Sequence, residues 1–392
     1  MDLLEIFGVK ESYQLPDAIM AALLSEKAAE YVDAVRDSGI SDLRDYYQSD
    51  AGDRKKLKQD FTPQCVCGLV AQLLLPGSVL DMCSGTGALG KAAAGHELHC
   101  QEFSERTIPF ALLDACVTGT DEILDQADCL RGNVEKSYKV HGGKARERDP
   151  EGLGKFANVV MNPPYSMSFP DTEDYLFFGM QVPKSKADYG FVLQGLSHLE
   201  EGGRLIAVLP HGVLFRGQKE GKIREWLIEQ KLIYAVIGLP ENLFLNTSIP
   251  VCLMVLQKGD GHTLFIDASK EFEKRGNQNV MDPAHAADAF HKRKDEERYA
   301  HLATLEEIRG NGYNLNIPRY VDTYVPEPPI DIVALTREIE EIERQERETK
   351  EKLAELLAEL QAPTGDAEVI GWHRRILEGG NTEGEYQGAV HG

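Results

Sequence analysis

The sequence predicts an α/β protein built on a mostly parallel β-sheet, with a short helical segment before the sheet and a long helix after it. Between residues 61 and 260, short apolar runs alternate with amphipathic stretches, which is the pattern of β-α-β units. Several runs are apolar throughout, as expected for central strands covered on both faces. A heptad-like series of apolar residues near the carboxyl end indicates the long helix.

The composition is that of a folded globular protein. Of 392 residues, 42% are hydrophobic and 27% are charged, and at roughly 150 residues per domain this length allows one to three domains. The 64 acidic residues outnumber the 42 lysines and arginines, for a net charge of −22. A broad basic surface that holds nucleic acid unaided is therefore not expected, and a partner would have to supply it.

The first residues and the cysteines give expectations about cellular location and metal binding. The first residues carry acids and no basic leader before an apolar core, and no run approaches about 18 apolar residues, so we expect a cytoplasmic protein that does not contact a membrane. Seven scattered cysteines form no Cys-x-x-Cys pair and no disulfide framework. Cys65 and Cys67 lack a second ligand pair at metal-binding spacing, so no metal is expected.

The chain before the C-terminal helix is predicted to have three parts. Residues 1–60 mix apolar and charged positions at helical spacing and predict a small helical segment. In 61–260, the predicted catalytic domain, the expected strands are 78–82, 98–103, 156–161, 204–209, 232–239 and 251–257. Residues 261–329 are more polar, with one further strand-like run at 263–267, and predict an accessory segment docked on the core.

The predicted C-terminal helix spans residues 330–361. Its apolar residues recur in steps of three and four, at Ile332, Leu335, Ile339, Ile342, Leu353, Leu356 and Leu360. Glu346 and Thr349 are polar members of the same series, but the register holds for about four heptads, which indicates a seam that faces a partner. The alternative is a helix folded back on its own domain. Residues 362–392 are rich in glycine and glutamate and are expected to form a mobile tail.

A glycine-rich turn follows the first predicted strand. Asp81 stands near the end of that strand, and Ser84, Gly85 and Gly87 follow, where missing side chains let a ligand approach backbone N–H groups at the start of a helix. No Gly-Lys-Ser/Thr follows, which disfavours a triphosphate loop. An acid at the strand end suits a cationic or hydroxyl-bearing group instead.

Two further acids close the next predicted strands. Glu102 lies 21 residues after Asp81, a position from which a carboxylate can accept both hydroxyls of a ribose. Asp128, followed by Cys129, fits the end of the third strand and is suited to accept a hydrogen bond from an adenine amino group. Each acid alone is equally consistent with a solvated loop. Their placement at three successive strand ends favours a ligand site.

The tetrapeptide Asn162-Pro163-Pro164-Tyr165 directly follows the apolar run 156–161. Two prolines cannot continue a strand ladder, so a stiff loop presents the Asn162 side chain and the Pro163 carbonyl, both of which accept hydrogen bonds. Two fixed acceptors on a planar amino group favour the pyramidal form whose lone pair attacks a methyl group. Tyr165 can stack on the attached ring. An ordinary Pro-Pro turn is the alternative.

With these motifs, the chain resembles the S-adenosylmethionine-dependent amino-methyltransferases, and more narrowly the modification subunits of type I restriction-modification systems, which methylate adenine N6 in DNA. The resemblance covers about two-thirds of the chain, from Asp60 to Val321. Several of its strings have no role in generic methyl transfer and so indicate the subfamily. The supporting strings are 60–63, 101–102, 203–210, 212–216, 236–240, 277–279 and 313–321.

The resemblance implies a class I S-adenosylmethionine-dependent methyltransferase fold, Rossmann-like, with a seven-stranded mostly parallel sheet. Asn162, Pro163, Pro164 and Tyr165 would hold an adenine flipped out of double-stranded DNA, and asparagine at the first position favours adenine over cytosine by family habit. Neither a metal nor a covalent intermediate is needed. The implied cofactor-binding residues are Phe61, Thr62 and Pro63 for the methionine side, Asp81, Ser84, Gly85 and Gly87 for the amino acid and turn, Glu102 for the ribose, and Asp128 and Cys129 for the adenine.

The sequence also departs from the resembled subunits. They carry a longer helical domain before the cofactor loop than the 80 residues here, so contacts that such a domain makes to DNA or to a second modification subunit are in doubt. No variable stretch large enough for target recognition is apparent. Sequence choice is therefore expected to lie with a specificity subunit, and a restriction subunit is a possible further partner.

Three other functions remain open on the sequence. The chain is alternatively a solitary DNA adenine methyltransferase, a protein-glutamine or RNA amino-methyltransferase, or a catalytically silent cofactor-binding interaction subunit. The string 313–321 and the heptad helix weigh against the protein and RNA substrates. The intact residues 162–165 weigh against a silent subunit.

Overall fold

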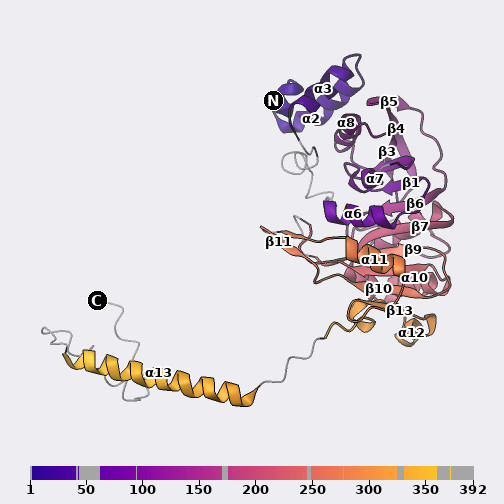
Figure 1. Ribbon diagram of the computed structural model, residues 1–392. Helices are drawn as coiled ribbons and strands as arrows, with labels where there is room; N and C mark the ends of the chain where they lie inside the picture. Colours follow the sequence, from indigo (N-terminus) through magenta and orange to yellow (C-terminus); the bar gives the residue numbers. More distant parts are fainter. Residues whose placement is uncertain are drawn as a thin grey trace. The chain divides into compact units, whose positions relative to one another are not determined.

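The computed structural model describes residues 2–40, 43, 62–93, 95–169, 175–244, 249–276, 278–324, 331–359 and 371. The chain divides into two units, Met1–Tyr324 and Val325–Gly392, which are considered separately. The first unit holds an α/β domain around one large sheet, and the described part of the second unit contains a long helix (Figure 1).

Seven central strands form the predicted mostly parallel sheet, in the order β3-β2-β1-β6-β7-β9-β8. Only β9 runs antiparallel to its neighbours, β7 and β8. The predicted α/β fold is confirmed. The strands are β1 (Val79–Met82), β2 (Leu98–Glu102), β3 (Glu122–Asp128), β6 (Phe156–Met161), β7 (Leu199–Pro210), β8 (Ile233–Gly238) and β9 (Val251–Leu256).

Four more strands extend the sheet to eleven. On one edge lie β10 (Thr263–Asp267), parallel to β8, and β13 (Ala300–Ala303), antiparallel to β10. On the other edge lies a hairpin of β4 (Asn133–His141) and β5 (Lys144–Arg148). This hairpin escaped prediction because much of it is exposed, so its residues form no apolar run.

Helices pack on both faces of the sheet, as the alternation of strand side chains requires. Val79 and Val160 belong to one hydrophobic core, and Leu80 and Val159 belong to the other. The helices of the first face are α1 (Leu3–Ile6), α2 (Leu15–Leu23), α3 (Ala28–Asp37), α6 (Gln64–Leu73), α7 (Ala88–Ala92), α8 (Ile108–Thr118) and α11 (Ala284–Lys292). Those of the second face are α9 (Asp188–Ser197), α10 (Gln218–Glu229) and α12 (Leu305–Gly310).

The remaining short elements connect these layers. A small separate hairpin is formed by β11 (Glu273–Arg275) and β12 (Gln278–Val280). Within the described ranges, 3₁₀ turns cover Ser12–Gln14, His211–Leu214 and Ile317–Arg319. The helical N-terminal segment packs on α8, where Arg36 donates hydrogen bonds to the carbonyl oxygens of Cys116 and Val117 at 2.7 and 2.9 Å.

The second unit contains α13 (Ile332–Glu359), the predicted long C-terminal helix. Its 28 residues span about 42 Å at 1.5 Å per residue. Pairs one turn apart, such as Arg344 with Glu348 and Lys350 with Glu346, support the helix on its polar side. Within the described part of the chain, none of the helices combines the length and apolar character that crossing a membrane requires.

Candidate functional site

The glycine-rich turn joins β1 to α7 as the sequence predicts. Gly85 and Gly87 have φ angles of +57° and +83°, which glycine adopts without strain. The buried Asp81 carboxylate accepts a hydrogen bond at 2.8 Å from the N–H of Gly90. A Cβ at Gly90 would lie 2.7 Å from Leu98 Cδ1 and 3.1 Å from Asp81 Oδ2, so the helix can approach the strand this closely only with glycine there. Gly90, the last glycine of a Gly-x-Gly-x-x-Gly spacing, was not predicted as a site residue.

Glu102, the last residue of β2, links the turn to the neighbouring strand. Its two carboxylate oxygens accept hydrogen bonds from the N–H of Gly85 at 2.9 Å and from the N–H of Ser104 at 2.8 Å. Each oxygen of a carboxylate has a second lone pair, so a hydroxyl-bearing ligand can still be bound. Burial raises the pKa of Glu102 above its ordinary value, and burial raises that of Asp81 to about 7.

Two hydroxyls in the turn fit a bound ligand. Ser84 Oγ and Thr86 Oγ1 are buried and have no hydrogen-bond partner within the described residues. Buried polar atoms normally have partners, so these two indicate a group supplied from outside the chain. With the glycine N–H groups and the carboxylates of Asp81 and Glu102, they fit a ligand that carries an amine, a carboxylate and ribose hydroxyls.

Asp128 and Cys129 lie at the end of β3, as predicted. The nearby Cys129 side chain, and then burial, raise the pKa of the Cys83 thiol well above its ordinary value, so the loops that follow β1 and β3 lie close together here. Both oxygens of Asp128 are engaged within its own loop. Oδ1 accepts from the N–H groups of Leu130 and Arg131 at 3.0 and 3.2 Å, and Oδ2 accepts from the Arg131 guanidinium at 2.5 Å.

The tetrapeptide 162–165 follows β6, next to β1 in the sheet. Asn162 Nδ2 donates to Thr62 Oγ1 at 3.0 Å, and the Tyr165 hydroxyl donates to Asn162 Oδ1 at 2.8 Å. Thr62 and Pro63 immediately precede α6, so residues about one hundred positions apart meet at one site. Pro163 is buried and Pro164 is half-buried. Phe61 lies outside the described residues.

Sequence reasoning missed Phe244. Its ring meets Tyr165 edge-on, with ring centroids 6.3 Å apart and planes at 78°. The backbone of residues 241–243 is fastened by hydrogen bonds from the hairpin β11-β12: the Asn279 side chain donates to the Glu241 carbonyl at 2.7 Å, and the Gln278 side chain donates to that of Leu243. The string 277–279 gave the only sequence signal, without indicating what it contacts.

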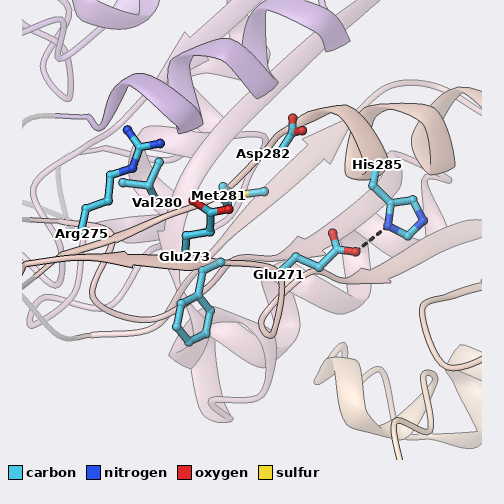
Figure 2. A pocket seen from close by; sticks show the side chains of 8 residues that line it. Glu271, Glu273, Arg275, Val280, Met281, Asp282 and His285 are labelled. Atoms are coloured by element: carbon cyan, nitrogen blue, oxygen red, sulfur yellow. Dashed lines mark hydrogen bonds and ion pairs between the residues drawn. The ribbon is translucent and has the colours of Figure 1, made fainter.

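A pocket of about 510 Å³ lies beside the same hairpin and holds none of the predicted site residues (Figure 2). His285 there forms ion pairs with Glu271 at 2.5 Å and Glu296 at 2.8 Å, and its ring stacks on Tyr299. Among the residues that the structure describes, no group of three or more His, Cys, Asp or Glu side chains is arranged to hold a metal ion.

Comparison with known proteins identifies the family. Residues 43–327 match the model of the family described as N-6 DNA Methylase. The chain belongs to the N-6 DNA methylase family. Its fold is that of class I S-adenosylmethionine-dependent methyltransferases, and membership of this family implies use of S-adenosylmethionine. The glycine-rich turn, the carboxylates of Asp81 and Glu102, and the unpartnered hydroxyls of the turn fit such a cofactor.

Several similar proteins are type I methylase subunits, which confirms the resemblance found in the sequence. The MpnII methylase subunit of Mycoplasma pneumoniae is 29% identical, over 80% of this chain and 62% of that protein. The MjaVII methylase subunit of Methanocaldococcus jannaschii is 30% identical, over 82% and 56%. The crystal structure of a type I restriction-modification methyltransferase subunit from Streptococcus thermophilus aligns with a TM-score of 0.59 and 37% identity, over 67% of this chain and 59% of that one. The chain thus spans about three-fifths of these relatives.

Proposed function

We propose that this chain transfers a methyl group from S-adenosylmethionine to N6 of an adenine flipped out of DNA, as the modification subunit of a type I restriction-modification-like complex. The observation that carries the proposal is the contact of Asn162 with both Tyr165 and Thr62 at the end of β6. This contact joins the tetrapeptide to the chain segment that enters α6, beside the strand that bears the glycine turn.

The cofactor-binding residues in this proposal surround the turn. Thr62 and Pro63, with Phe61, take the methionine side, and Asp81, Ser84, Gly85 and Gly87 take the amino acid end. Glu102 accepts from the ribose hydroxyls, and Asp128 and Cys129 lie at the adenine end, where Arg131 holds the Asp128 carboxylate. When bound, S-adenosylmethionine supplies an electrophilic methyl group.

The target base is held by the tetrapeptide in this proposal. Asn162 Oδ1 and the Pro163 carbonyl accept hydrogen bonds from the N6 amino group, which directs its lone pair out of the ring plane. Pro164 stiffens the loop, and the rings of Tyr165 and Phe244 flank the base. A base stacked in duplex DNA cannot reach such a pocket, so the adenine must be flipped.

The proposal is tested by mapping N6-methyladenine in the genomic DNA of cells that express the chain with its neighbouring genes, the chain alone, or the Asn162→Ala variant with the neighbours. Single-molecule sequencing is the readout. We expect a split, two-part motif to be methylated only with the intact chain and its neighbours. Methylation by the chain alone would make it a solitary enzyme. If all three strains lack methylation, the remaining candidates are protein or RNA substrates and a silent subunit.

For α13, we propose contact with the specificity subunit. The helix exposes apolar side chains at heptad spacing, including Ile339 and Ile342, which are 49% and 57% exposed. An exposed apolar stripe on a helix is stabilised by burial against another surface. The partner's helices are the surface expected from the type I resemblance.

Replacing Ile339 and Ile342 by glutamate is expected to weaken copurification with the specificity subunit at least tenfold. Burial of an aliphatic side chain contributes about 1.5–3 kcal/mol, and a charge in the seam removes that contribution. The matched control replaces Glu340 and Glu343 of the same helix by alanine. Unchanged copurification would contradict the proposal. A lowered melting temperature of the isolated chain would instead indicate a helix folded back on its own domain.

A further inference from the structure

The catalytic loop ends in a backbone conformation that is unusual for serine. Ser166, directly after Tyr165, has a φ angle of +50°, in the left-handed region that disfavours side chains with a Cβ. Its N–H donates a hydrogen bond to Asp188 Oδ1 at 2.9 Å. Such a conformation persists only where the surroundings impose it. The Asp188 carboxylate is therefore the group that holds the turn at the end of the tetrapeptide.

Asp188 is itself held by the guanidinium of Arg216. It is fully buried at the first position of α9, and its second oxygen accepts from Arg216 at 2.8 Å. The same guanidinium pairs with Glu220 on α10, with Nε and Oε2 2.7 Å apart. Ser166 Oγ also lies 3.4 Å from Arg216 Nη1. Carboxylate and guanidinium together fix both the backbone and the side chain of Ser166.

Arg224 of α10 links the Arg216 backbone to the string 313–321. The guanidinium of buried Arg224 donates to the carbonyl oxygens of Arg216 at 2.9 Å and of Tyr313 at 2.7 Å. Leu315 N–H donates to the carbonyl of Leu214 at 2.9 Å. Segment 313–315 therefore supports the loop that presents Arg216, so the strings 212–216 and 313–321 meet in the fold.

The buried ion pairs of Arg216 with Asp188 and Glu220 are not explained by apolar packing. Two buried acids share one arginine, and burying charges is costly unless each is closely paired. This charged network holds the residue that directly follows the tetrapeptide. Beyond Ser166, the chain pairs with the segment before α9, through Ala187 N–H to Met167 O and Phe169 N–H to Lys184 O, both at 2.8 Å.

We propose that Asp188, oriented by Arg216, is a positioning residue that sets Asn162 and Tyr165 for capture of the target base. The inference rests on the proposed function for its effect on methyl transfer. Asp188 acts on the loop through the Ser166 N–H. Its loss is expected to displace the tetrapeptide without altering the cofactor turn, because the contacts of Glu102 and Asp81 involve other residues.

The test uses the full chain, with the neighbouring genes where turnover is measured. Asp188→Asn keeps an acceptor oxygen but loses the charge that binds Arg216. We expect kcat for DNA methylation to fall about 100-fold, as small misplacements of catalytic groups do, with the Kd for S-adenosylmethionine changed less than twofold. Hydrogen exchange of the backbone amides at 165–167 should quicken at least tenfold. Glu225→Gln, which removes an exposed carboxylate on α10, is the matched control.

Rescue separates positioning from a general loss of structure. Ser166→Gly removes the steric penalty of the left-handed turn, so adding it to Asp188→Asn should restore kcat at least fivefold and slow the exchange again. Unchanged kcat and exchange in Asp188→Asn, or no rescue by glycine, would overturn the inference. If Asp188→Asn does not fold, Arg216→Lys replaces it with the same expected results. Exchange needs no substrate, so a chain that never methylates DNA fails the proposed function while the loop measurement still decides this inference.

Discussion

Replacing Asn162 by alanine is expected to lower kcat for adenine methylation by about a thousandfold and to leave the Kd for S-adenosylmethionine within threefold. The side chain supplies an acceptor that acts on the amino group as its lone pair forms the new bond, and loss of one such group costs about 10²–10³ in rate. Its described partners are Thr62 and Tyr165, and neither belongs to the glycine turn. Single-turnover kinetics and calorimetric titration measure the two quantities separately.

Asn133→Ala is the matched control, because Asn133 is an exposed asparagine at the start of β4. It should retain full turnover. A variant at Asn162 that keeps more than a tenth of the normal kcat would contradict the role assigned to this amide. Equal losses of turnover and cofactor affinity would show instead that the substitution disturbs the contact with Thr62 and the segment before α6.

Replacing Glu102 by glutamine is expected to raise the Kd for S-adenosylmethionine about 100-fold. Glutamine has one acceptor oxygen and one NH₂ group, so it cannot accept from both Gly85 and Ser104 and leaves one N–H facing a donor. It also loses the charge that strengthens hydrogen bonds from ribose hydroxyls, each worth about 1.5–3 kcal/mol. Equilibrium binding of the cofactor measures the effect.

Glu105→Gln provides the control, since Glu105 is an exposed acid three residues further along the chain. Its cofactor affinity should equal that of the unmodified chain. A Kd for Glu102→Gln within threefold of normal would remove Glu102 from the ribose site. Melting temperatures of the two chains without cofactor are measured in parallel. A lower value for Glu102→Gln would show that the substitution destabilises the glycine turn itself, because the Gly85 contact is present in the unliganded chain.

The sequence predicted those parts of the fold that depend on local pattern. Every predicted strand lies in the sheet, because an apolar run of about six residues indicates burial on both faces. The three acids at successive strand ends followed from the same pattern. The ion pair of Asp128 with Arg131, three residues away, is also local, but a pairing of polar side chains outside the core is not indicated by a hydrophobic pattern.

The features that escaped prediction depend on contacts between distant residues. Phe244 reaches Tyr165 only through the position of the loop after β8, which the hairpin β11-β12 holds. Asp188 reads in sequence as an acid in the first turn of a helix, a common and favourable place for any carboxylate. Its contact with Ser166 depends on how α9 is set against β6. The roles assigned to the individual site residues stay predictions until such variants are measured.

In the proposed site, an arriving base would meet an Asn162 Oδ1 that already accepts a hydrogen bond from the Tyr165 hydroxyl. An incoming amino group would replace the phenol at that oxygen or use its second lone pair, so Asn162 Oδ1 would keep a donor throughout. A thymine carries a carbonyl at the corresponding ring position, so it would place an acceptor without a donor against Asn162 Oδ1, at a cost of about 1–3 kcal/mol. Under the proposed function, discrimination against keto bases would thus begin on entry, before any methyl group moves.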